Sequence, residues 1–204
     1  GTNAELRNTQ FSAMRVKDAI CDELRAQTGT RPEISKHRPD VQINVSIHAK
    51  KATIAIDLAG EPLHKRGYRQ EGENVQAPLK EALAAGVLLM SPWARVVEGL
   101  KAGTLEPQDC VLIDPFCGGG TLVIEGAMMA ADMAPGILRD YWGFSGWRQF
   151  DPEVFARLLA EADARLEAGL VRMPRIVGSD IDPRAIEIAR AQAGRVGLAG
   201  FIDL

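Results

Sequence analysis

Hydrophobic and polar positions follow two different patterns along this chain. Residues 12–27 carry apolar side chains at helical spacing, which predicts an amphipathic helix that starts at Ser12. Residues 41–47 alternate strictly between apolar and polar, and 52–58 form a second apolar stretch, so we expect two strands joined by a hairpin turn. One helix and two strands form a thin core. We therefore expect residues 1–60 to be an α/β segment that begins inside a domain.

Continuous apolar runs replace this alternation in the second half of the chain. A helix is predicted over 77–90, with Pro78 in its first turn. Residues 111–113 and 175–180 are short apolar runs that lead into acidic residues, and a helical pattern follows each. Strands that alternate with helices predict a parallel sheet with right-handed crossovers. The expected fold class is α/β.

The first of these strands leads into an acidic, glycine-rich turn. Asp114 ends the strand, Gly118–Gly120 follow, and a helix pattern begins directly after Thr121. Glycines let a ligand approach the main chain, and the start of a helix offers free N–H groups, so this turn is typical of a nucleotide cradle. The second strand ends in Asp180, where a carboxylate can accept hydrogen bonds from ribose hydroxyls.

The chemistry of the turn selects among nucleotides. It matches neither the phosphate-binding loop with its lysine nor the G-x-G-x-x-G turn that holds the pyrophosphate of NAD. An acid repels phosphate but suits an ammonium group, so Asp114 fits an amino-acid moiety while Asp180 fits a ribose. Together they indicate S-adenosyl-L-methionine as the cofactor. The structural alternative makes Asp114 a helix N-cap and the glycines an ordinary tight turn.

Composition limits the class of protein. Among the 204 residues, 46% are hydrophobic, as in an ordinary globular protein, and no apolar run approaches the ~20 residues of a membrane span. Nothing at the start resembles a signal peptide. Three widely spaced cysteines suit reduced thiols in a cytoplasm better than disulfides or a metal site. Cys117 lies in the turn, where a packing role is favoured over a nucleophile because no histidine partner is evident.

The distribution of charge indicates a polyanionic partner. Residues 1–70 hold 12 Lys and Arg against 8 Asp and Glu, whereas 71–204 hold 12 against 19. Residues 61–74 form a connector in which cations flank an aromatic side chain, the combination that nucleic-acid contacts use. The alternative is a linker with solvated charges. We predict RNA contacts by Lys50, Lys51, Lys65, Arg66, Tyr68 and Arg69.

The separation of the two acids is unusually long. A compact βαβ unit places the second acid about 20 residues after the first glycine, whereas Asp114 and Asp180 are 66 positions apart. We therefore expect 133–170 to be an insertion beside the ligand site. Its aromatic residues either pack over the cofactor or a base, or attach the insertion to its domain: Trp142, Phe144 and Trp147.

Several strings together resemble a known family. They are Leu-His-Lys-Arg-Gly-Tyr-Arg at 63–69, Ala-Pro-Leu-Lys at 77–80, Asp-Pro-Phe-Cys-Gly-Gly-Gly-Thr at 114–121 and Gly-Ser-Asp-Ile-Asp-Pro at 178–183. The chain is similar to THUMP-domain class I methyltransferases that act on RNA, in particular bacterial enzymes that methylate N2 of a guanine in large-subunit ribosomal RNA. These are often labelled N6-adenine-specific DNA methylases.

The resemblance implies a domain plan and a cofactor site. Residues 1–60 would be the C-terminal part of a THUMP RNA-binding domain, 61–74 the connector, and 75–204 the N-terminal part of a Rossmann-like methyltransferase domain. The cofactor-binding residues would be Pro78, Leu79, Asp114, Pro115, Phe116, Cys117, Gly118, Gly119, Gly120, Thr121, Asp180, Ile181 and Asp182.

The chain departs from the family in one respect. Members carry an Asn-Pro-Pro-Tyr type motif, which orients the weakly nucleophilic exocyclic amine and stacks on the extruded base, and this chain has no such string. We therefore expect a fragment without the catalytic region and name no catalytic residue. The alternatives are a DNA adenine-N6 methyltransferase, a non-catalytic scaffold that binds RNA or cofactor and, last, a NAD-dependent oxidoreductase.

Overall fold

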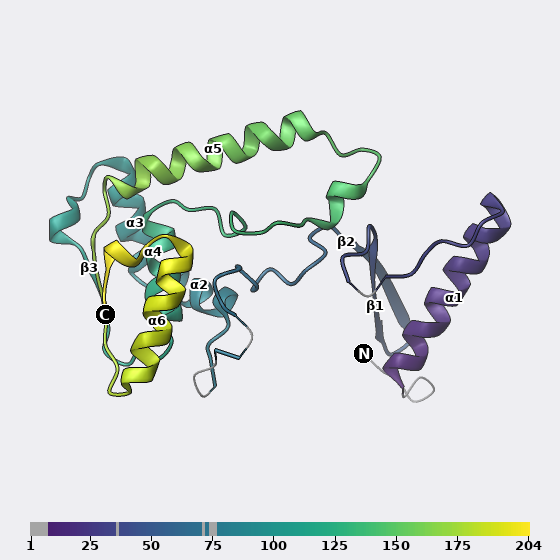
Figure 1. Ribbon diagram of the computed structural model, residues 1–204, viewed down its shortest axis with the longest axis horizontal. Coiled ribbons are helices and arrows are strands. Elements are labelled where there is room, and N and C mark those ends of the chain that lie inside the picture. The colour runs from purple at the N-terminus through teal and green to yellow at the C-terminus, as the bar shows by residue number, and fades with distance from the viewer. Residues whose placement is uncertain (1–7, 36, 71, 74–76) are drawn as a thin grey trace. The chain divides into compact units, whose positions relative to one another are not determined.

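The computed structural model describes residues 8–35, 37–70, 72–73 and 77–204 (Figure 1). They form two compact units. The first holds the described residues up to Glu61 together with Tyr141–Phe150, and the second holds the described residues of Pro62–Asp140 together with Asp151–Leu204.

The first unit is built from one helix and one hairpin: α1 (Thr9–Thr28), β1 (Gln42–His48) and β2 (Lys51–Asp57). The helix starts three residues earlier than predicted, because the side chain of Asn8, not Ser12, caps it by accepting the N–H of Phe11. Gly29, with a φ of 78°, ends it. The strands pair antiparallel, from Gln42 opposite Asp57 to His48 opposite Lys51, as the alternation indicated.

The aromatic loop of the expected insertion belongs to this first unit. Its short 3₁₀ turn, η2 (Gly143–Gly146), places the amides of Gly143 and Phe144 3.2 Å from the carbonyls of Ala59 and Leu58. The indole N–H of Trp147 donates to the carbonyl of Asp40 over 2.7 Å. The loop therefore attaches to residues on both sides of the hairpin, within the first unit. The sequence alternative, attachment of the insertion to its own domain, is corrected accordingly.

The second unit contains a parallel sheet with helices between its strands, and this confirms the α/β class. Its strand order is β3–β4–β5, with Val111 opposite Arg175 and Ile176 opposite Ile202. The strands are β3 (Val111–Asp114), β4 (Arg175–Gly178) and β5 (Ile202–Asp203). The helices are α2 (Glu81–Met90), α3 (Trp93–Ala102), α4 (Thr121–Ala130), α5 (Pro152–Leu170) and α6 (Pro183–Val196), with 3₁₀ turns η1 (Pro107–Asp109) and η3 (Ala199–Phe201).

Two helices differ from the sequence prediction. α2 begins at Glu81 instead of residue 77, because Ala77 has a φ of 55° and the chain stays non-helical through Pro78 and Leu79. Helix α3 was not predicted at all. It starts immediately after Pro92 and ends at Gly103, whose φ is 68°. Pro92 is the N-cap residue of this helix, and its fixed backbone angle suits a helix start.

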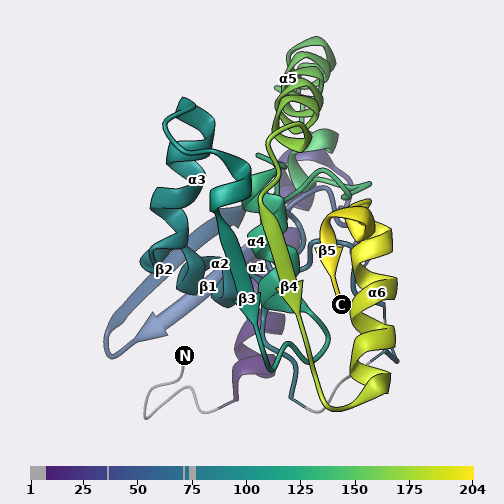
Figure 2. The same cartoon turned by 90° about the vertical axis from the view of Figure 1, so that its left-hand side faces the viewer.

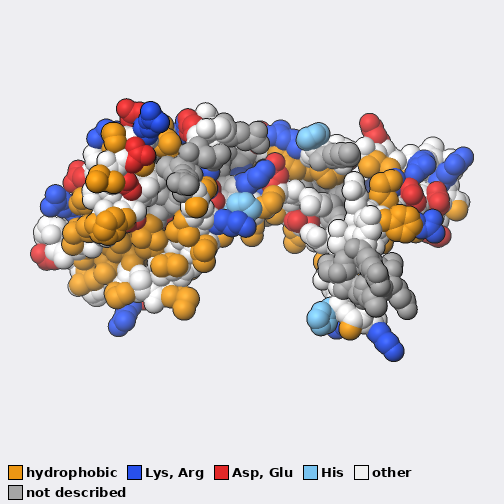
Figure 3. Space-filling model, turned by 90° about the horizontal axis from the view of Figure 1, so that it is seen from below, with side chains coloured by type: hydrophobic (Ala, Val, Ile, Leu, Met, Phe, Trp, Pro, Cys, Tyr) orange, Lys and Arg blue, Asp and Glu red, His pale blue; other side chains and the backbone are white. Residues whose placement is uncertain are grey.

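The core of the second unit lies between the sheet and α4 (Figure 2). Val123, Ile124 and Ala127 of α4 are fully buried, and Ile176 of β4 is almost so. The other side of β3 leaves Val111 and Ile113 exposed, and Figure 3 shows apolar side chains gathered on this unit. Within the described residues no single helix is long and apolar enough to cross a membrane, although the bent pair α2 and α3 together would be.

Helix α5 is fastened to the core near its C-terminal end. A Cβ atom on Gly169 would lie 1.9 Å from the carbonyl oxygen of Ala131, so only glycine permits this approach. Next to it, Asp132 accepts hydrogen bonds from Lys101 of α3 and from Arg165 of α5, at 2.6 and 2.8 Å. These bonds, that from Arg165 first, lower the pKa of Asp132 to about 2.

Candidate functional site

The ends of β3 and β4 and the turns that follow them form the site. The carboxylate of Asp114 accepts the N–H of Phe116 at 3.1 Å. Two main-chain bonds of 2.9 Å, from Ser179 N to Asp114 O and from Cys117 N to Ser179 O, join the two strand ends. Because neighbouring parallel strands end at the same edge of a sheet, the two acidic turns meet despite their separation in sequence.

Asp180 is fixed against the glycine turn. One of its carboxylate oxygens accepts the N–H of Gly118 at 2.8 Å, and the other accepts the N–H of Asp182 at 2.9 Å. These two bonds, that from Asp182 first, lower the pKa of Asp180, so its carboxylate is charged at neutral pH. Asp182 itself accepts the N–H of Arg184 and caps α6, which gives this predicted cofactor residue a structural task.

Helix α4 begins directly after the glycine turn, and its N-cap residue has no side chain to cap it. That residue is Gly120, with a φ of 79°, so Asp114 does not cap the helix. The other part of the structural alternative is seen, because the N–H of Gly120 donates to the carbonyl of Cys117 at 2.8 Å and closes a tight turn. A Cβ atom on Gly120 would lie 2.9 Å from the Cβ atom of Ala189, which adds a packing reason for glycine. Uncapped N–H groups at a helix start favour an anion such as a carboxylate.

Cys117 is a packing residue in this turn. It is 7% exposed, and its sulfur would lie 3.2 Å from a Cβ atom placed on Gly178. Burial, followed by the charges of Asp114 and Asp180, raises the pKa of its thiol to about 11. The thiol therefore stays protonated at neutral pH, which removes the alternative of a nucleophile.

A hollow of about 350 Å³ lies beside Asp180. Ile181, which lines the hollow, is fully exposed, and Phe116 in the glycine turn is mostly exposed. Large apolar side chains on the surface favour contact with a flat, apolar ligand group. The sequence analysis did not predict most of the residues that line this hollow. Several of them share one face of α6, so the helical spacing there was the signal that could have identified them. The lining residues are Ser179, Asp180, Ile181, Pro183, Ile186, Glu187, Arg190 and Leu204.

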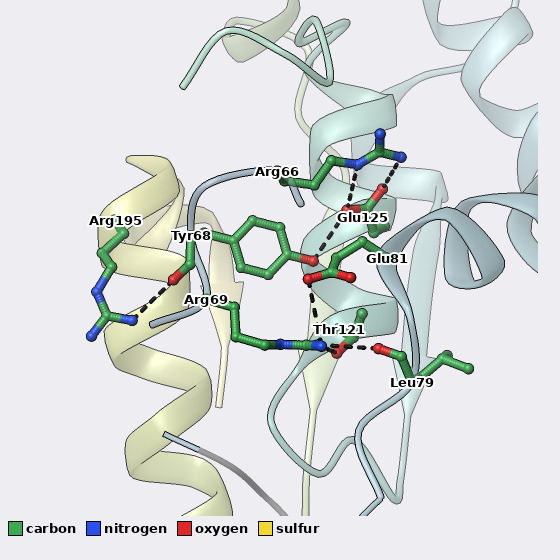
Figure 4. Close-up of polar contacts among 8 residues, drawn as sticks. All are labelled: Arg66, Tyr68, Arg69, Leu79, Glu81, Thr121, Glu125 and Arg195. Atoms are coloured by element: carbon green, nitrogen blue, oxygen red, sulfur yellow. Dashed lines mark hydrogen bonds and ion pairs between the residues drawn. The ribbon is translucent and has the colours of Figure 1, made fainter. Parts of the chain in front are cut away.

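The connector packs on α4 through a buried ion pair (Figure 4). Arg66 and Glu125 form a two-pronged contact of 3.3 and 3.2 Å, and the hydroxyl of Tyr68 donates to the same carboxylate at 3.1 Å. Tyr68 is 0% exposed and Glu125 is 2% exposed. Burial raises the pKa of both groups, while Arg66 opposes that rise at Glu125. A buried tyrosine cannot stack on a base, and Arg66 is already paired, so the prediction that these two contact RNA is corrected.

Arg69 is also used inside the second unit. It reaches three groups: Thr121 Oγ1 at 2.9 Å, the carbonyl of Leu79 at 3.1 Å and the carboxylate of Glu81 at 3.5 Å (Figure 4). Its side chain is 20% exposed. The prediction of RNA contact is corrected here too, because the guanidinium is occupied by protein groups.

The remaining predicted RNA contacts lie on the surface. Lys50, Lys51 and Lys65 are all exposed, so a polyanion can reach them, and they remain predictions. No group of three or more His, Cys, Asp or Glu residues is arranged for a metal ion within the described part of the chain.

Comparison with known proteins identifies the family. Residues 66–204 match the model described as the RMKL-like methyltransferase domain, and residues 2–57 match the THUMP domain. The chain belongs to the RMKL-like methyltransferase family. The resemblance inferred from the motifs is thereby confirmed, and so is the pairing of a THUMP domain with a methyltransferase domain.

Curated relatives extend beyond the matched region. The protein named ribosomal RNA large subunit methyltransferase K/L in Syntrophotalea carbinolica is 47% identical over 195 residues, 96% of this chain and 26% of that protein. The protein of the same name in Methylococcus capsulatus is 47% identical over 98% of this chain and 26% of its own length. The RMKL-like chain thus spans about a quarter of the length of these relatives.

Solved structures share the fold. The crystal structure of SMU.472 in complex with SAH superposes with a TM-score of 0.70 at 33% identity, over 92% of this chain and 45% of that one. A protein from Listeria monocytogenes, whose description predicts an N6-adenine-specific DNA methylase, gives 0.71 at 31% identity over the same shares.

Proposed function

We propose that the RMKL-like chain is the cofactor-binding part of an S-adenosylmethionine-dependent methyltransferase that acts on large-subunit ribosomal RNA. The observation that carries this proposal is the hydrogen bond between Gly118 and Asp180. It fixes a charged carboxylate against a glycine turn that has an uncapped helix start behind it. A ligand with an amino-acid end and a ribose needs the carboxylate and the uncapped helix start close to each other.

The residues of the site suit the parts of this cofactor. Asp114 would hold the ammonium group, the free N–H groups at the start of α4 would hold the carboxylate, and Asp180 would accept the ribose hydroxyls. Ile181 would lie against the adenine ring in the hollow beside Asp180. When bound, the cofactor supplies a methyl group on a sulfonium. We assign positioning of the cofactor to this part of the protein, because its residues would hold both ends of the ligand.

The methylated atom is proposed to be the exocyclic N2 of a guanine. The sequence contains no Asn-Pro-Pro-Tyr type string to orient an amine. We propose that the orienting groups come from a region that these 204 residues do not contain, and that this chain alone does not turn over. Relatives named as ribosomal RNA methyltransferases, together with the THUMP match, support RNA as the partner and the cytoplasm as the compartment.

A calorimetric titration tests the cofactor assignment. The 204-residue chain should bind S-adenosylhomocysteine with one site per chain and should not bind NADH at the same concentrations. Binding of NADH instead, or no heat with either compound, contradicts the proposal. Mass spectrometry of ribosomal RNA from a strain lacking the gene should show one guanine without its N2 methyl group, and unchanged RNA contradicts the substrate.

DNA adenine methylation is the second candidate, because the description of the Listeria relative favours it. The basic first part of the chain and the THUMP match support RNA instead. Filter binding at several salt concentrations separates the two. RNA should bind more tightly than duplex DNA of the same length and charge at every salt concentration, and equal affinities contradict RNA as the partner.

A further inference from the structure

Arg69 joins two segments that flank the methionine end of the proposed cofactor site. The same Nη2 atom donates to Thr121 Oγ1 at 2.9 Å and to the carbonyl of Leu79 at 3.1 Å (Figure 4). Thr121 is the first residue of α4 and directly follows Gly120 of the glycine turn. Leu79 lies in the non-helical stretch that leads into α2. One guanidinium therefore sets the distance between the starts of two helices.

Neither helix start is held by the side chain of its own N-cap residue. Gly120 of α4 and Lys80 of α2 make no side-chain hydrogen bond to their helices. A helix start normally gains a serine, threonine, aspartate or asparagine cap. Neither start thus depends on a cap from its own N-cap side chain, and Arg69 bonds to a group at each of them.

The contact with Glu81 is a poor stabiliser by itself. Its closest approach to Arg69 is 3.5 Å, and within the described residues the second carboxylate oxygen has no hydrogen-bond partner although Glu81 is only 3% exposed. A buried ion pair with an unsatisfied oxygen adds little stability relative to apolar side chains of the same size. By contrast, Arg66 meets both oxygens of Glu125. What the Arg69 pair does provide is a fixed orientation for a rigid guanidinium.

We propose that Arg69 is a positioning residue for the cofactor. It holds the start of α4 and the 77–79 segment at the spacing that receives the amino-acid end of S-adenosylmethionine. The inference rests on the proposed function and adds to it a residue that makes no contact with the cofactor. The adenosine end, which Asp180 and Ile181 would receive, lies with β4 and α6, whereas Arg69 bonds to groups of α4, α2 and the segment before α2.

Two ligands separate these ends. S-adenosylhomocysteine carries the amino-acid moiety, whereas 5′-methylthioadenosine keeps the adenosine and sulfur but lacks it. The measured quantity is the ratio of the two dissociation constants for each folded variant, determined by calorimetry. Loss of a positioning residue at the amino-acid end should lower the preference for S-adenosylhomocysteine. A general loss of stability should leave the ratio unchanged.

The test variant is the double substitution Arg69→Gln with Glu81→Gln, which removes both charges and so leaves no buried charge unpaired. We expect the dissociation constant of S-adenosylhomocysteine to rise about tenfold, a free energy of about 1.4 kcal/mol, and that of 5′-methylthioadenosine to change less than about twofold. The matched control is Arg66→Gln with Glu125→Gln, which removes the neighbouring buried pair but touches neither Thr121 nor Leu79. It should lower the melting temperature and keep the ratio.

Three results overturn the inference. The first is an unchanged ratio of dissociation constants in the folded Arg69 and Glu81 double variant. The second is a change of this ratio in the Arg66 and Glu125 control as large as in the test variant. Should the double variant fail to fold, Arg69→Lys decides. It keeps the charge but not the planar fork, so an unchanged ratio there also refutes the role of Arg69. A wild-type chain that binds neither ligand contradicts the proposed function and this inference together, whereas wild-type binding with an unchanged variant ratio contradicts only the inference.

Discussion

Replacement of Asp180 by alanine tests the site most directly. The carboxylate accepts two main-chain N–H groups, from Gly118 and Asp182, at 2.8 and 2.9 Å. In the proposed complex it also accepts the ribose hydroxyls. Each charge-assisted hydrogen bond is typically worth about a factor of ten in affinity, so without them the dissociation constant of S-adenosylhomocysteine should rise about ten- to hundredfold. The N–H of Gly118 is also left without its acceptor, which loosens the turn.

Asp151 supplies a matched control for this experiment. Its carboxylate also accepts two main-chain N–H groups, from Glu153 and Val154, at 2.9 and 3.1 Å, but it caps α5 instead of joining the proposed site. Asp151→Ala should therefore lower the melting temperature by a few degrees, about as much as Asp180→Ala does, while affinity stays as in the wild type. Equal affinity for the ligand in the wild-type and Asp180→Ala proteins would refute the assignment of Asp180 to the ribose.

Three other predictions concern packing, pH and RNA. Gly169→Ala should destabilise the chain by about 2–4 kcal/mol in urea unfolding, because the new Cβ meets the Ala131 carbonyl at 1.9 Å. Gly86→Ala in α2, where an added Cβ has open space, should be neutral or stabilising. Asp132 has a lowered pKa, so its ion pairs stabilise the fold above about pH 4, and that stabilisation disappears as pH falls towards about 2. The unfolding free energies of wild type and Asp132→Asn should therefore converge over that range; a constant difference contradicts this role. Alanine at the three exposed lysines should reduce the salt dependence of RNA binding by about one unit of log–log slope for each phosphate that is no longer neutralised, and an unaltered slope would exclude all three: Lys50, Lys51 and Lys65.

The glycine turn and its two strands were predictable because their information is local. An apolar run that ends in an acid, followed by glycines, specifies a strand, a turn and a helix within about ten residues. The structure places β3, the turn and α4 where that pattern indicated. The start of α1 was mispredicted by three residues because Asn8 and Ser12 both have capping side chains, and only the observed bond from Phe11 N to Asn8 distinguishes them.

The role of the connector was not predictable from local sequence. Three cations beside a tyrosine are the pattern of an RNA contact, but Glu125 lies 59 positions from Arg66 and 57 from Tyr68. Nothing near the connector in sequence identifies that carboxylate as a partner. An acidic residue within an otherwise apolar helical pattern was the available signal, since a charge that becomes buried must find a partner. Glu125 in α4 and Glu81 in α2 both fit that description.

The long separation of Asp114 and Asp180 has a physical explanation in the pairing of the strands. Asp114 lies opposite Gly178, so the end of β3 is aligned with the end of β4 whatever length of chain connects them. The connecting chain includes residues 141–150, which pack in the first unit. A connection can therefore leave one unit, contribute to another and return without moving the strand ends, because the register is fixed by hydrogen bonds within the sheet. Sequence spacing alone is thus a weak test for such a site. The stronger test is whether two acid-ended strands pair in register.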